Sequence, residues 1–402
     1  MQELQQTTGT TPSQYEGALA SAGNVSSELC QRAWVEIDQA ALYHNVQQLK
    51  KLLAHPTQLM AVVKADAYGH GATVVARTVL EAGAGGLCVA TLQEGIQLRQ
   101  AGIEAPILLL GAINTPEQVQ AIAHWQLQPT VCTPQQALVF SETLSDLKKT
   151  LSVHLKLDTG MSRLGMPWQE ATEFVQLVQR LPYLEMKSVY SHLATADSLD
   201  QTVMRSQHQR FEEAIAQLHE AGITPPCLHL ANSAATLTDP ALHYDFVRVG
   251  LALYGLYPAE HLRPTVDLKP VMQVKARVTQ VKTIPPGTGV SYGYQFIADR
   301  QLRLAVVGIG YADGIPRHLS NKMTVLIRGQ QIPQIGAITM DQLMLDVSEI
   351  PDLQTGEVVT LIGQDRDVQI SADDWAQSLG TISWEILCSF KHRLPRVAVN
   401  EA

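Results

Sequence analysis

The chain has 402 residues, of which 46% are hydrophobic and 17% charged, and this profile indicates a folded globular protein rather than a disordered or fibrous one. The formal net charge of −9 argues against nucleic acid and anionic membrane surfaces as partners. Uncharged apolar runs stay shorter than the roughly 18 residues that cross a bilayer, so we expect a cytoplasmic location without membrane contact.

Residues 1–30 contain no Lys or Arg and are rich in Gln, Thr, Ser and Gly. They have neither the basic start nor the apolar stretch of a signal peptide, so we expect a disordered tail. The cysteines are odd in number, widely spaced and never arranged as C-x-x-C: Cys30, Cys88, Cys132, Cys227 and Cys388. This pattern fits a reducing compartment rather than a disulfide framework. The 13 histidines form no H-E-x-x-H pair, so we expect no metal.

Residues 31–264 alternate short apolar runs with amphipathic segments that have helical periodicity, such as 73–82, 169–180 and 203–221. The apolar runs, rich in Val, Ile and Leu, are typical of strands buried on both faces: 59–63, 86–91, 106–111, 128–133, 152–158, 186–192, 227–232 and 245–253. Eight such strands alternating with helices predict an α/β fold, a (β/α)₈ TIM-type barrel. An open doubly wound sheet is the alternative, but no G-x-G-x-x-G follows the first strand.

Prolines at 258, 264 and 270 mark a change of pattern, and we expect a second, mostly-β domain over residues 265–402. Apolar and polar residues alternate over 274–279, the period of a half-solvated antiparallel strand. Further strand-like stretches follow, with one short helix near 371–379: 302–309, 323–328, 343–347 and 358–362. The strand-like segment 34–37 precedes the barrel and could pair with either domain.

Reactive groups of such a barrel lie at the carboxyl ends of its strands and in the loops that follow. Lys64 directly follows the first strand, where a lone lysine is most often a snorkelling or ion-paired side chain. A desolvated lysine near other cations instead has a lowered pKa and becomes an amine nucleophile suited to Schiff-base formation. Three cations at neighbouring strand ends could lower the pKa of this lysine: Lys156, Arg163 and Arg248.

Ser233 and Gly250 follow the seventh strand and end the eighth, where barrels commonly bind phosphate through backbone N–H groups. Ser233 could equally be a plain helix N-cap. A barrel lysine combined with a phosphate cradle suggests a phosphate-bearing aldehyde cofactor, pyridoxal 5'-phosphate.

Together these landmarks resemble the alanine racemase family, and they span residues 61–341 in the family's order. They are Ala61-Val-Val-Lys64-Ala-Asp-Ala-Tyr68-Gly-His-Gly, Lys156-Leu-Asp-Thr-Gly-Met-Ser-Arg163-Leu-Gly, Ser191-His192, Asn232-Ser233, Arg248-Val-Gly250, Gly289-Val-Ser-Tyr292-Gly, Gly310-Tyr311-Ala-Asp313-Gly and Met340-Asp341. The resemblance implies a homodimeric, pyridoxal-phosphate-dependent isomerase that interconverts L-alanine and D-alanine and supplies D-alanine for peptidoglycan.

The family pattern also implies two catalytic residues and a phosphate site. Lys64 would hold the cofactor as an internal aldimine and act as one acid/base group. Tyr292 of the partner subunit would be the second base, on the opposite face of the substrate. Tyr68, Ser233 and the Gly250 backbone would bind the phosphate.

Further roles follow from the same resemblance. Arg248 would face the pyridine nitrogen, with His192 and His229 in its hydrogen-bond network. Arg163 would contact the cofactor's phenolic oxygen and the substrate carboxylate, braced by Lys156, which is often carbamylated in this family. Two residues of the partner chain, Tyr311 and Met340, would narrow the substrate entrance.

Arg248 bears on the type of reaction because arginine offers only donors and is effectively never deprotonated. A pyridine nitrogen facing it stays unprotonated, which makes the cofactor a weaker electron sink and favours racemisation over transamination. The plainer interpretation is that Arg248 closes an ion pair within its strand. Likewise, His192 and His229 could be hydrogen-bonded interior residues, and Tyr292 and Tyr311 ordinary interface tyrosines.

Two departures from the family pattern concern the entrance and the phosphate site. Ala337 and Thr339 stand where the family often has Arg and Cys, so a gate built from Arg317 and Asp341 would be looser. His392 lies near the place where many members have a tyrosine close to the phosphate, and its role stays open.

Three alternative functions remain at this point. A racemase of broad or serine specificity would share the same fold. A related barrel-type decarboxylase would place a carboxylate at the pyridine nitrogen, which Arg248 argues against. A non-catalytic pyridoxal-phosphate carrier would resemble the barrel alone and leave the domain that carries Tyr292 superfluous.

Overall fold

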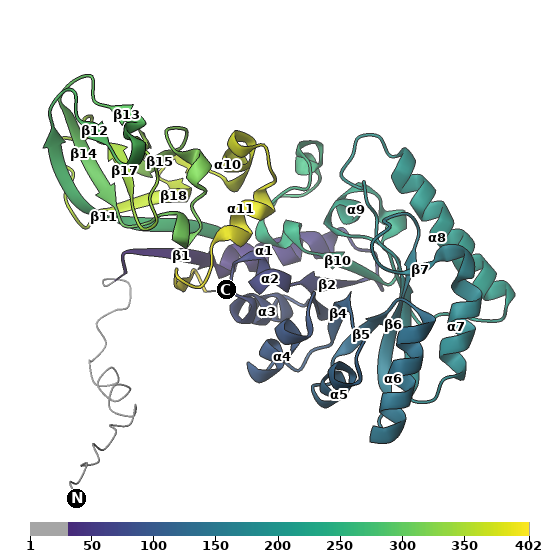
Figure 1. Cartoon of the computed structure of the whole chain (residues 1–402). Helices are drawn as coiled ribbons and strands as arrows, with labels where there is room; N and C mark the ends of the chain where they lie inside the picture. The colour runs from purple at the N-terminus through teal and green to yellow at the C-terminus, as the bar shows by residue number, and fades with distance from the viewer. Residues whose placement is uncertain (1–30, 402) are drawn as a thin grey trace, which may run out of the picture.

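The computed structural model describes residues 31–401, so the expected tail over residues 1–30 lies outside the described part of the chain. Figure 1 shows two lobes, a barrel ringed by helices and a lobe built mainly of strands. No helix within residues 31–401 has the length and apolar character needed to cross a membrane. These residues also contain no cluster of three or more His, Cys, Asp or Glu side chains placed to hold a metal ion.

The barrel contains eight parallel strands: β2 (Gln58–Val62), β3 (Gly86–Val89), β4 (Ile107–Ala112), β5 (Gln128–Val131), β6 (Leu151–Asp158), β8 (Leu184–Tyr190), β9 (Leu228–His229) and β10 (Phe246–Val249). They pair in the order β5-β4-β3-β2-β10-β9-β8-β6. A further parallel pairing of β5 with β6 closes the ring. The predicted (β/α)₈ barrel is therefore confirmed, and the open-sheet alternative is wrong.

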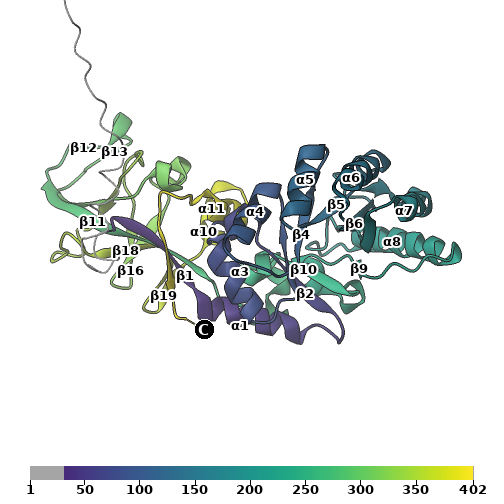
Figure 2. The same ribbon diagram turned by 90° about the horizontal axis from the view of Figure 1, so that it is seen from below.

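Helices cover the outside of the barrel (Figure 2): α1 (Gln39–Lys51), α3 (Ala72–Glu81), α4 (Leu92–Gln100), α5 (Pro116–His124), α6 (Pro134–Leu147), α7 (Ala171–Arg180) and α8 (Thr202–Glu220). For several of these helices, the residues at the N-terminal end explain where the helix begins. Thr91, Thr115 and Thr133 each cap a helix by accepting a backbone N–H bond. Proline occupies the start of α5 and α6, where its missing N–H costs nothing.

The C-terminal lobe is organised around the long strand β11 (Met272–Ile284), which pairs with β14 (Leu302–Val307) and β18 (Val358–Asp365). The sequence did not decide which domain the strand-like segment 34–37 pairs with. In the structure this segment lies in β1 (Ala33–Asp38), which pairs antiparallel with β11. It also pairs parallel with β20 (Arg396–Val399), so both ends of the described chain lie side by side. The described part of the chain thus starts in the C-terminal lobe and enters the barrel through α1 (Figure 1).

The sequence predicted one helix in this lobe, but the structure contains two α-helices, α10 (Ala372–Leu379) and α11 (Ser383–Ser389). The missed helix has seven residues, and its N-cap position, Ile382, has no side-chain cap. It forms against the barrel, where the backbone of Leu387 comes close to Gly69. The remaining strands are β7 (Met166–Pro167), β12 (Gly289–Val290), β13 (Phe296–Ile297), β15 (Thr324–Ile327), β16 (Gln330–Pro333), β17 (Leu343–Asp346) and β19 (Val368–Ile370).

Candidate active site

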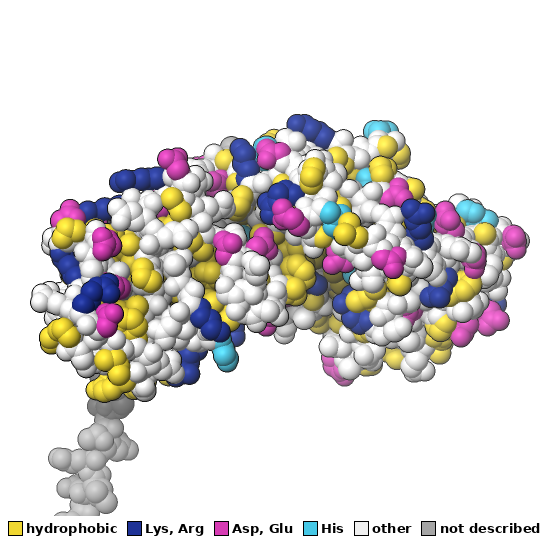
Figure 3. Space-filling model, turned by 90° about the horizontal axis from the view of Figure 1, so that it is seen from above, with side chains coloured by type: hydrophobic (Ala, Val, Ile, Leu, Met, Phe, Trp, Pro, Cys, Tyr) yellow, Lys and Arg dark blue, Asp and Glu magenta, His cyan; other side chains and the backbone are white. Residues whose placement is uncertain are grey.

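A cavity of about 560 Å³ lies at the carboxyl ends of the barrel strands. Eight of the predicted site residues line it together: Lys64, Tyr68, Lys156, Arg163, His192, Ser233, Arg248 and Gly250. Figure 3 shows that the upper face of the molecule is hollowed where the two lobes meet. The barrel therefore brings residues from distant parts of the sequence to one place, as strand-end positions require.

Lys64 begins a short turn, α2 (Lys64–Tyr68), whose backbone is left-handed. Residues 65–68 all have φ between 52° and 55°, although none of them is glycine. For L-residues this conformation costs roughly 1–2 kcal/mol each, so the surrounding structure must enforce it.

Contacts from three directions hold this turn. The Glu94 carboxylate accepts a hydrogen bond from the backbone N–H of Ala65 at 2.7 Å. The side chain of Asp66 accepts from the first N–H of α3 at 2.7 Å. From the C-terminal lobe, the Arg396 guanidinium donates to the carbonyl oxygen of Gly69 at 2.8 Å. Lys64 consequently starts from a rigid support.

The two lysines of the cavity are easier to deprotonate than ordinary lysines. Burial, with a contribution from the nearby Arg163 cation, lowers the pKa of Lys64. Burial and the Arg248 cation lower the pKa of Lys156 to about 8. Both amines therefore lose their proton more readily than an exposed lysine does, which makes the neutral, nucleophilic form more accessible.

The Ser233 hydroxyl and Gly250 form a compact polar corner of the cavity. The Ser233 Oγ atom accepts from the backbone N–H groups of Gly250 at 2.9 Å and Ala252 at 3.4 Å, so its own O–H remains available to donate. The cap of the adjacent helix α9 (Ser233–Thr238) is Asn232, so the plain N-cap interpretation of Ser233 is wrong. A Cβ atom on Gly250 would lie 2.6 Å from the Tyr68 Oη atom, so glycine keeps this corner open. The corner fits the phosphate of pyridoxal phosphate.

Arg248 is 4% exposed and bonded mainly to imidazoles and backbone carbonyls. Its Nη1 donates to His229 Nδ1 at 2.8 Å, and its Nη2 donates to the Ser191 carbonyl at 2.8 Å and to His192 Nδ1 at 3.2 Å. Within residues 31–401 it forms no ion pair with a carboxylate, so the ion-pair interpretation does not hold. Burial and the Arg248 cation lower the pKa values of His192 and His229, which keeps both rings neutral.

Three predicted site residues do not line the cavity of their own chain, and all are exposed: Tyr292 by 74%, Met340 by 52% and Tyr311 by 41%. Tyr292 follows β12, at the outer end of the C-terminal lobe in Figure 1. The loops that carry these side chains are bonded to one another, since Ser291 Oγ donates to the Ala337 carbonyl at 2.7 Å and the Tyr311 N–H donates to the Thr339 carbonyl at 3.0 Å. We call this set of exposed side chains the lobe face.

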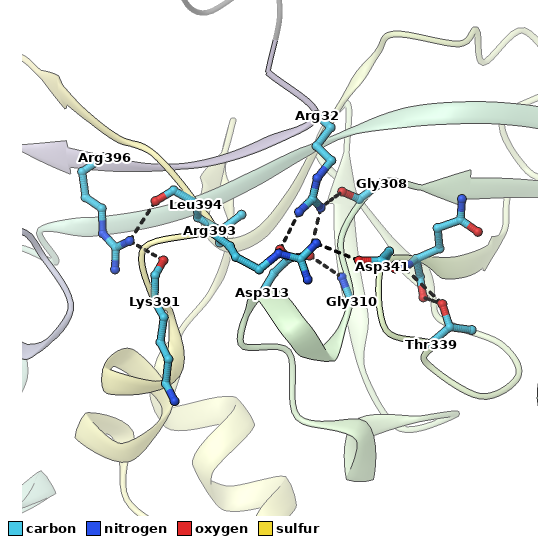
Figure 4. A network of polar contacts seen from close by, with 11 residues as sticks. Arg32, Gly308, Gly310, Asp313, Thr339, Asp341, Lys391, Arg393, Leu394 and Arg396 are labelled. Carbon is cyan, nitrogen blue, oxygen red and sulfur yellow. Dashed lines mark hydrogen bonds and ion pairs between the residues drawn. The ribbon is translucent and has the colours of Figure 1, made fainter. Parts of the chain in front are cut away.

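A network of charged residues lies beside the lobe face (Figure 4). Asp313 accepts from Arg32 at 2.6 Å, and Asp341 accepts from Arg393 at 2.7 Å. In the described chain, Asp341 therefore pairs with Arg393 rather than with Arg317, the gate partner that the sequence suggested. His392, whose role was open, is exposed and does not line the cavity.

Sequence reasoning gave no site role to several side chains that line the cavity, and two of them come from the C-terminal lobe, Trp384 and Cys388. Both lie on α11, where a spacing of four residues places them on the same face. The i, i+4 spacing was readable in the sequence, but the helix that carries it was not predicted.

Comparison with known families gives matches to both lobes. Residues 37–258 match the model of the alanine racemase N-terminal domain, and residues 271–398 match that of the alanine racemase C-terminal domain. Over 371 residues the chain is 70% identical to the alanine racemase of Nostoc sp., covering 92% of this chain and 96% of that protein. It is 65% identical to the alanine racemase of Synechocystis sp., covering 92% of this chain and 99% of that protein.

Solved structures give the same result. The alanine racemase of Bacillus anthracis with bound L-Ala-P superposes with a TM-score of 0.87 at 37% identity, covering 92% of this chain and 96% of that one. The alanine racemase of Streptomyces coelicolor A3(2) superposes with a TM-score of 0.86 at 36% identity, covering 93% of this chain and 100% of that one.

Proposed function

The chain belongs to the alanine racemase family of pyridoxal-phosphate-dependent isomerases, and we propose that it interconverts L-alanine and D-alanine with two bases, Lys64 and Tyr292 of the partner subunit. One observation carries this proposal. A lysine, a buried arginine and a polar corner share one cavity, while Tyr292, the proposed second base, lies on an exposed face of the other lobe.

Different residues of the cavity would bind different parts of pyridoxal phosphate. The Lys64 amine would bond to the cofactor aldehyde, and Tyr68, Ser233 and Gly250 would hold its phosphate. Arg248, on the neighbouring strand β10, would donate to the pyridine nitrogen. When bound, the cofactor supplies the electron sink that makes the Cα–H bond of alanine acidic.

Racemisation requires a proton to leave one face of Cα and another to arrive on the opposite face. Two groups on opposite sides can do this if one accepts while the other donates. Lys64 serves one face, and its lowered pKa makes the neutral amine accessible. Tyr292 of the partner subunit serves the other face, so the enzyme is a homodimer with shared sites. Its exposure in the single chain leaves Tyr292 free to enter a neighbouring cavity.

Substrate orientation would depend on Arg163 and Lys156. Arg163 would donate to the alanine carboxylate and to the phenolic oxygen of the cofactor. Lys156, neutral above about pH 8, would add to carbon dioxide. This forms an N–C bond, releases one proton and yields a carbamate whose negative charge braces Arg163.

Tyr311 and Met340 of the lobe face would narrow the entrance, which favours alanine over larger substrates. The product would supply cytoplasmic peptidoglycan synthesis with D-alanine.

The proposal is tested with purified enzyme, pyridoxal phosphate and each enantiomer of alanine in deuterated water. We expect both enantiomers to racemise with deuterium incorporated at Cα, and Tyr292→Phe to slow both directions by roughly 10²–10⁴-fold. Tyr294→Phe is the matched control, because Tyr294 is 68% exposed in the same turn. An unaffected Tyr292→Phe variant would exclude the two-base assignment. Wild-type enzyme that racemises serine as fast as alanine would favour the broad-specificity alternative.

A further inference from the structure

Behind Arg248, buried side chains form a continuous row across neighbouring strands of the barrel. Arg248 on β10 contacts His229 on β9, with 2.8 Å between Nη1 and Nδ1. The His229 Nε2 atom lies 2.8 Å from Ser188 Oγ on β8. Ser188 Oγ lies 2.7 Å from His154 Nδ1 on β6, and His154 Nε2 lies 3.1 Å from Gln128 Oε1 on β5. His229, Ser188 and His154 are each at most 2% exposed.

The chemistry of the two ends fixes the direction of every bond in this row. Arginine can only donate, so His229 Nδ1 must accept and the ring proton must be on Nε2. His229 therefore donates to Ser188, whose single hydroxyl proton is then free to point to His154 Nδ1. The carboxamide oxygen of Gln128 can only accept, which places the His154 proton on Nε2. All four bonds point away from Arg248.

We propose that Ser188 and His154 are positioning residues that hold Arg248 through a one-directional hydrogen-bond row ending at Gln128. The row keeps His229 in the tautomer that can accept from Arg248. Without the Ser188 acceptor, the ring proton of His229 can move to Nδ1. An N–H would then face the Arg248 Nη1 group, and the two donors would push the guanidinium from its position.

The surroundings of the row support neutral rings in both histidines. The ring of His229 stacks on Tyr190 at 4.5 Å between centroids, and the Arg248 guanidinium lies 5.1 Å from the centre of the same Tyr190 ring. Burial, together with the cations Lys187 and Arg248, lowers the pKa of His154 to about 3. Protonating His229 would add a cation next to Arg248, and protonating His154 would add one within the field of Lys187 and Arg248, both in buried places. The directional row therefore persists over the working pH range.

This inference rests on the proposed role of Arg248 at the pyridine nitrogen. A guanidinium held in place keeps that nitrogen unprotonated, which suppresses transamination relative to racemisation. A displaced guanidinium leaves the nitrogen open to a proton from water. Ser188 therefore acts on the outcome of the reaction from a distance, through His229.

The direct test is a neutron crystal structure of the deuterated wild-type holoenzyme, in which deuterium positions are seen. We expect deuterium on Nε2 and none on Nδ1 in both His229 and His154. Deuterium on Nδ1 of either ring would overturn the proposal. This readout does not depend on activity, so it separates failure of the row from failure of the proposed function, which wild-type alanine racemisation tests.

A second test compares Ser188→Ala with Ser141→Ala, which removes another buried serine hydroxyl, on α6, where Ser141 Oγ donates to the Pro182 carbonyl at 2.9 Å. The measured quantity is pyruvate released per alanine racemised. Loss of one neutral hydrogen bond predicts a rise of roughly 2- to 10-fold for Ser188→Ala and no change for Ser141→Ala. Equal ratios in the two variants would overturn the proposal.

Discussion

The barrel cavity and the lobe face place their functional residues in opposite ways. In the cavity, Arg248 is 4% exposed and bonded on several sides, and Lys64 begins a turn that three separate contacts hold. On the lobe face, Tyr292 is 74% exposed and Met340 is 52% exposed. The buried, bonded residues of the cavity suit the holding of a fixed group, whereas the exposed lobe face suits contact with another surface. Under the proposed shared site, each chain would carry two incomplete halves of a site.

The largest effect in the barrel should be a pH dependence of stability that comes from the buried amine of Lys156. Its usual pKa of 10.5 applies in the unfolded chain, against about 8 in the folded one. Between these values the unfolded chain binds the extra proton, so stability rises with pH by about 3 kcal/mol. The measured quantity is the difference in the free energy of unfolding between the wild type and Lys156→Met, obtained by urea unfolding without carbon dioxide. We expect this difference to rise by the same amount from pH 7 to pH 10.5. Lys149→Met, an exposed control, should show no such rise.

The next largest effect, on kcat, should come from loosening the left-handed turn that supports Lys64. Glu94→Gln replaces a carboxylate that accepts three backbone N–H bonds, from Ala65 at 2.7 Å, Ala90 at 2.7 Å and Thr91 at 3.0 Å. A charged hydrogen bond contributes about 1.5–3 kcal/mol. We expect kcat to fall roughly 10-fold or more while Glu117→Gln, an exposed control on α5, stays at the wild-type value. Equal kcat values in both variants would mean that the turn needs no such support.

The smallest effect on activity and stability should come from a substitution in the charged network beside the lobe face. The pair of Asp341 with Arg393 has side chains 57% and 38% exposed, and such surface pairs contribute about 0.2–1 kcal/mol. Asp341→Asn should therefore change KM for alanine by no more than roughly 5-fold and leave kcat and Tm nearly unchanged. A loss of activity comparable to that of Glu94→Gln would contradict the contrast between a rigid cavity and a lightly held face.

Residues next to strand ends in the sequence were predictable, because a barrel gathers all strand ends at one rim. Lys64, Arg163 and Ser233 follow directly from this rule. The contributions of the C-terminal lobe to the cavity were not predictable in this way. Trp384 and Cys388 reach the cavity on a seven-residue helix that has no side-chain cap and packs against α10 as well as against the barrel turn α2.

Two further features needed three-dimensional contacts. Asp341 and Arg393 are 52 residues apart, and no local pattern distinguishes Arg393 from Arg317 as the partner. Ser188 is an inconspicuous residue inside strand β8, and its proposed role emerges only when His229 and His154 are found on either side of its hydroxyl. Pairings across strands depend on register, which the sequence does not state.

The shared site is tested most directly by a heterodimer of two inactive variants, Lys64→Ala and Tyr292→Phe, purified with a different tag on each chain. If the site is shared, one of its two cavities combines an intact lysine from one chain with an intact tyrosine from the other. We expect the heterodimer to racemise alanine at about half the wild-type rate per dimer, while each homodimeric variant remains near background. A heterodimer as inactive as its parents would contradict the shared site.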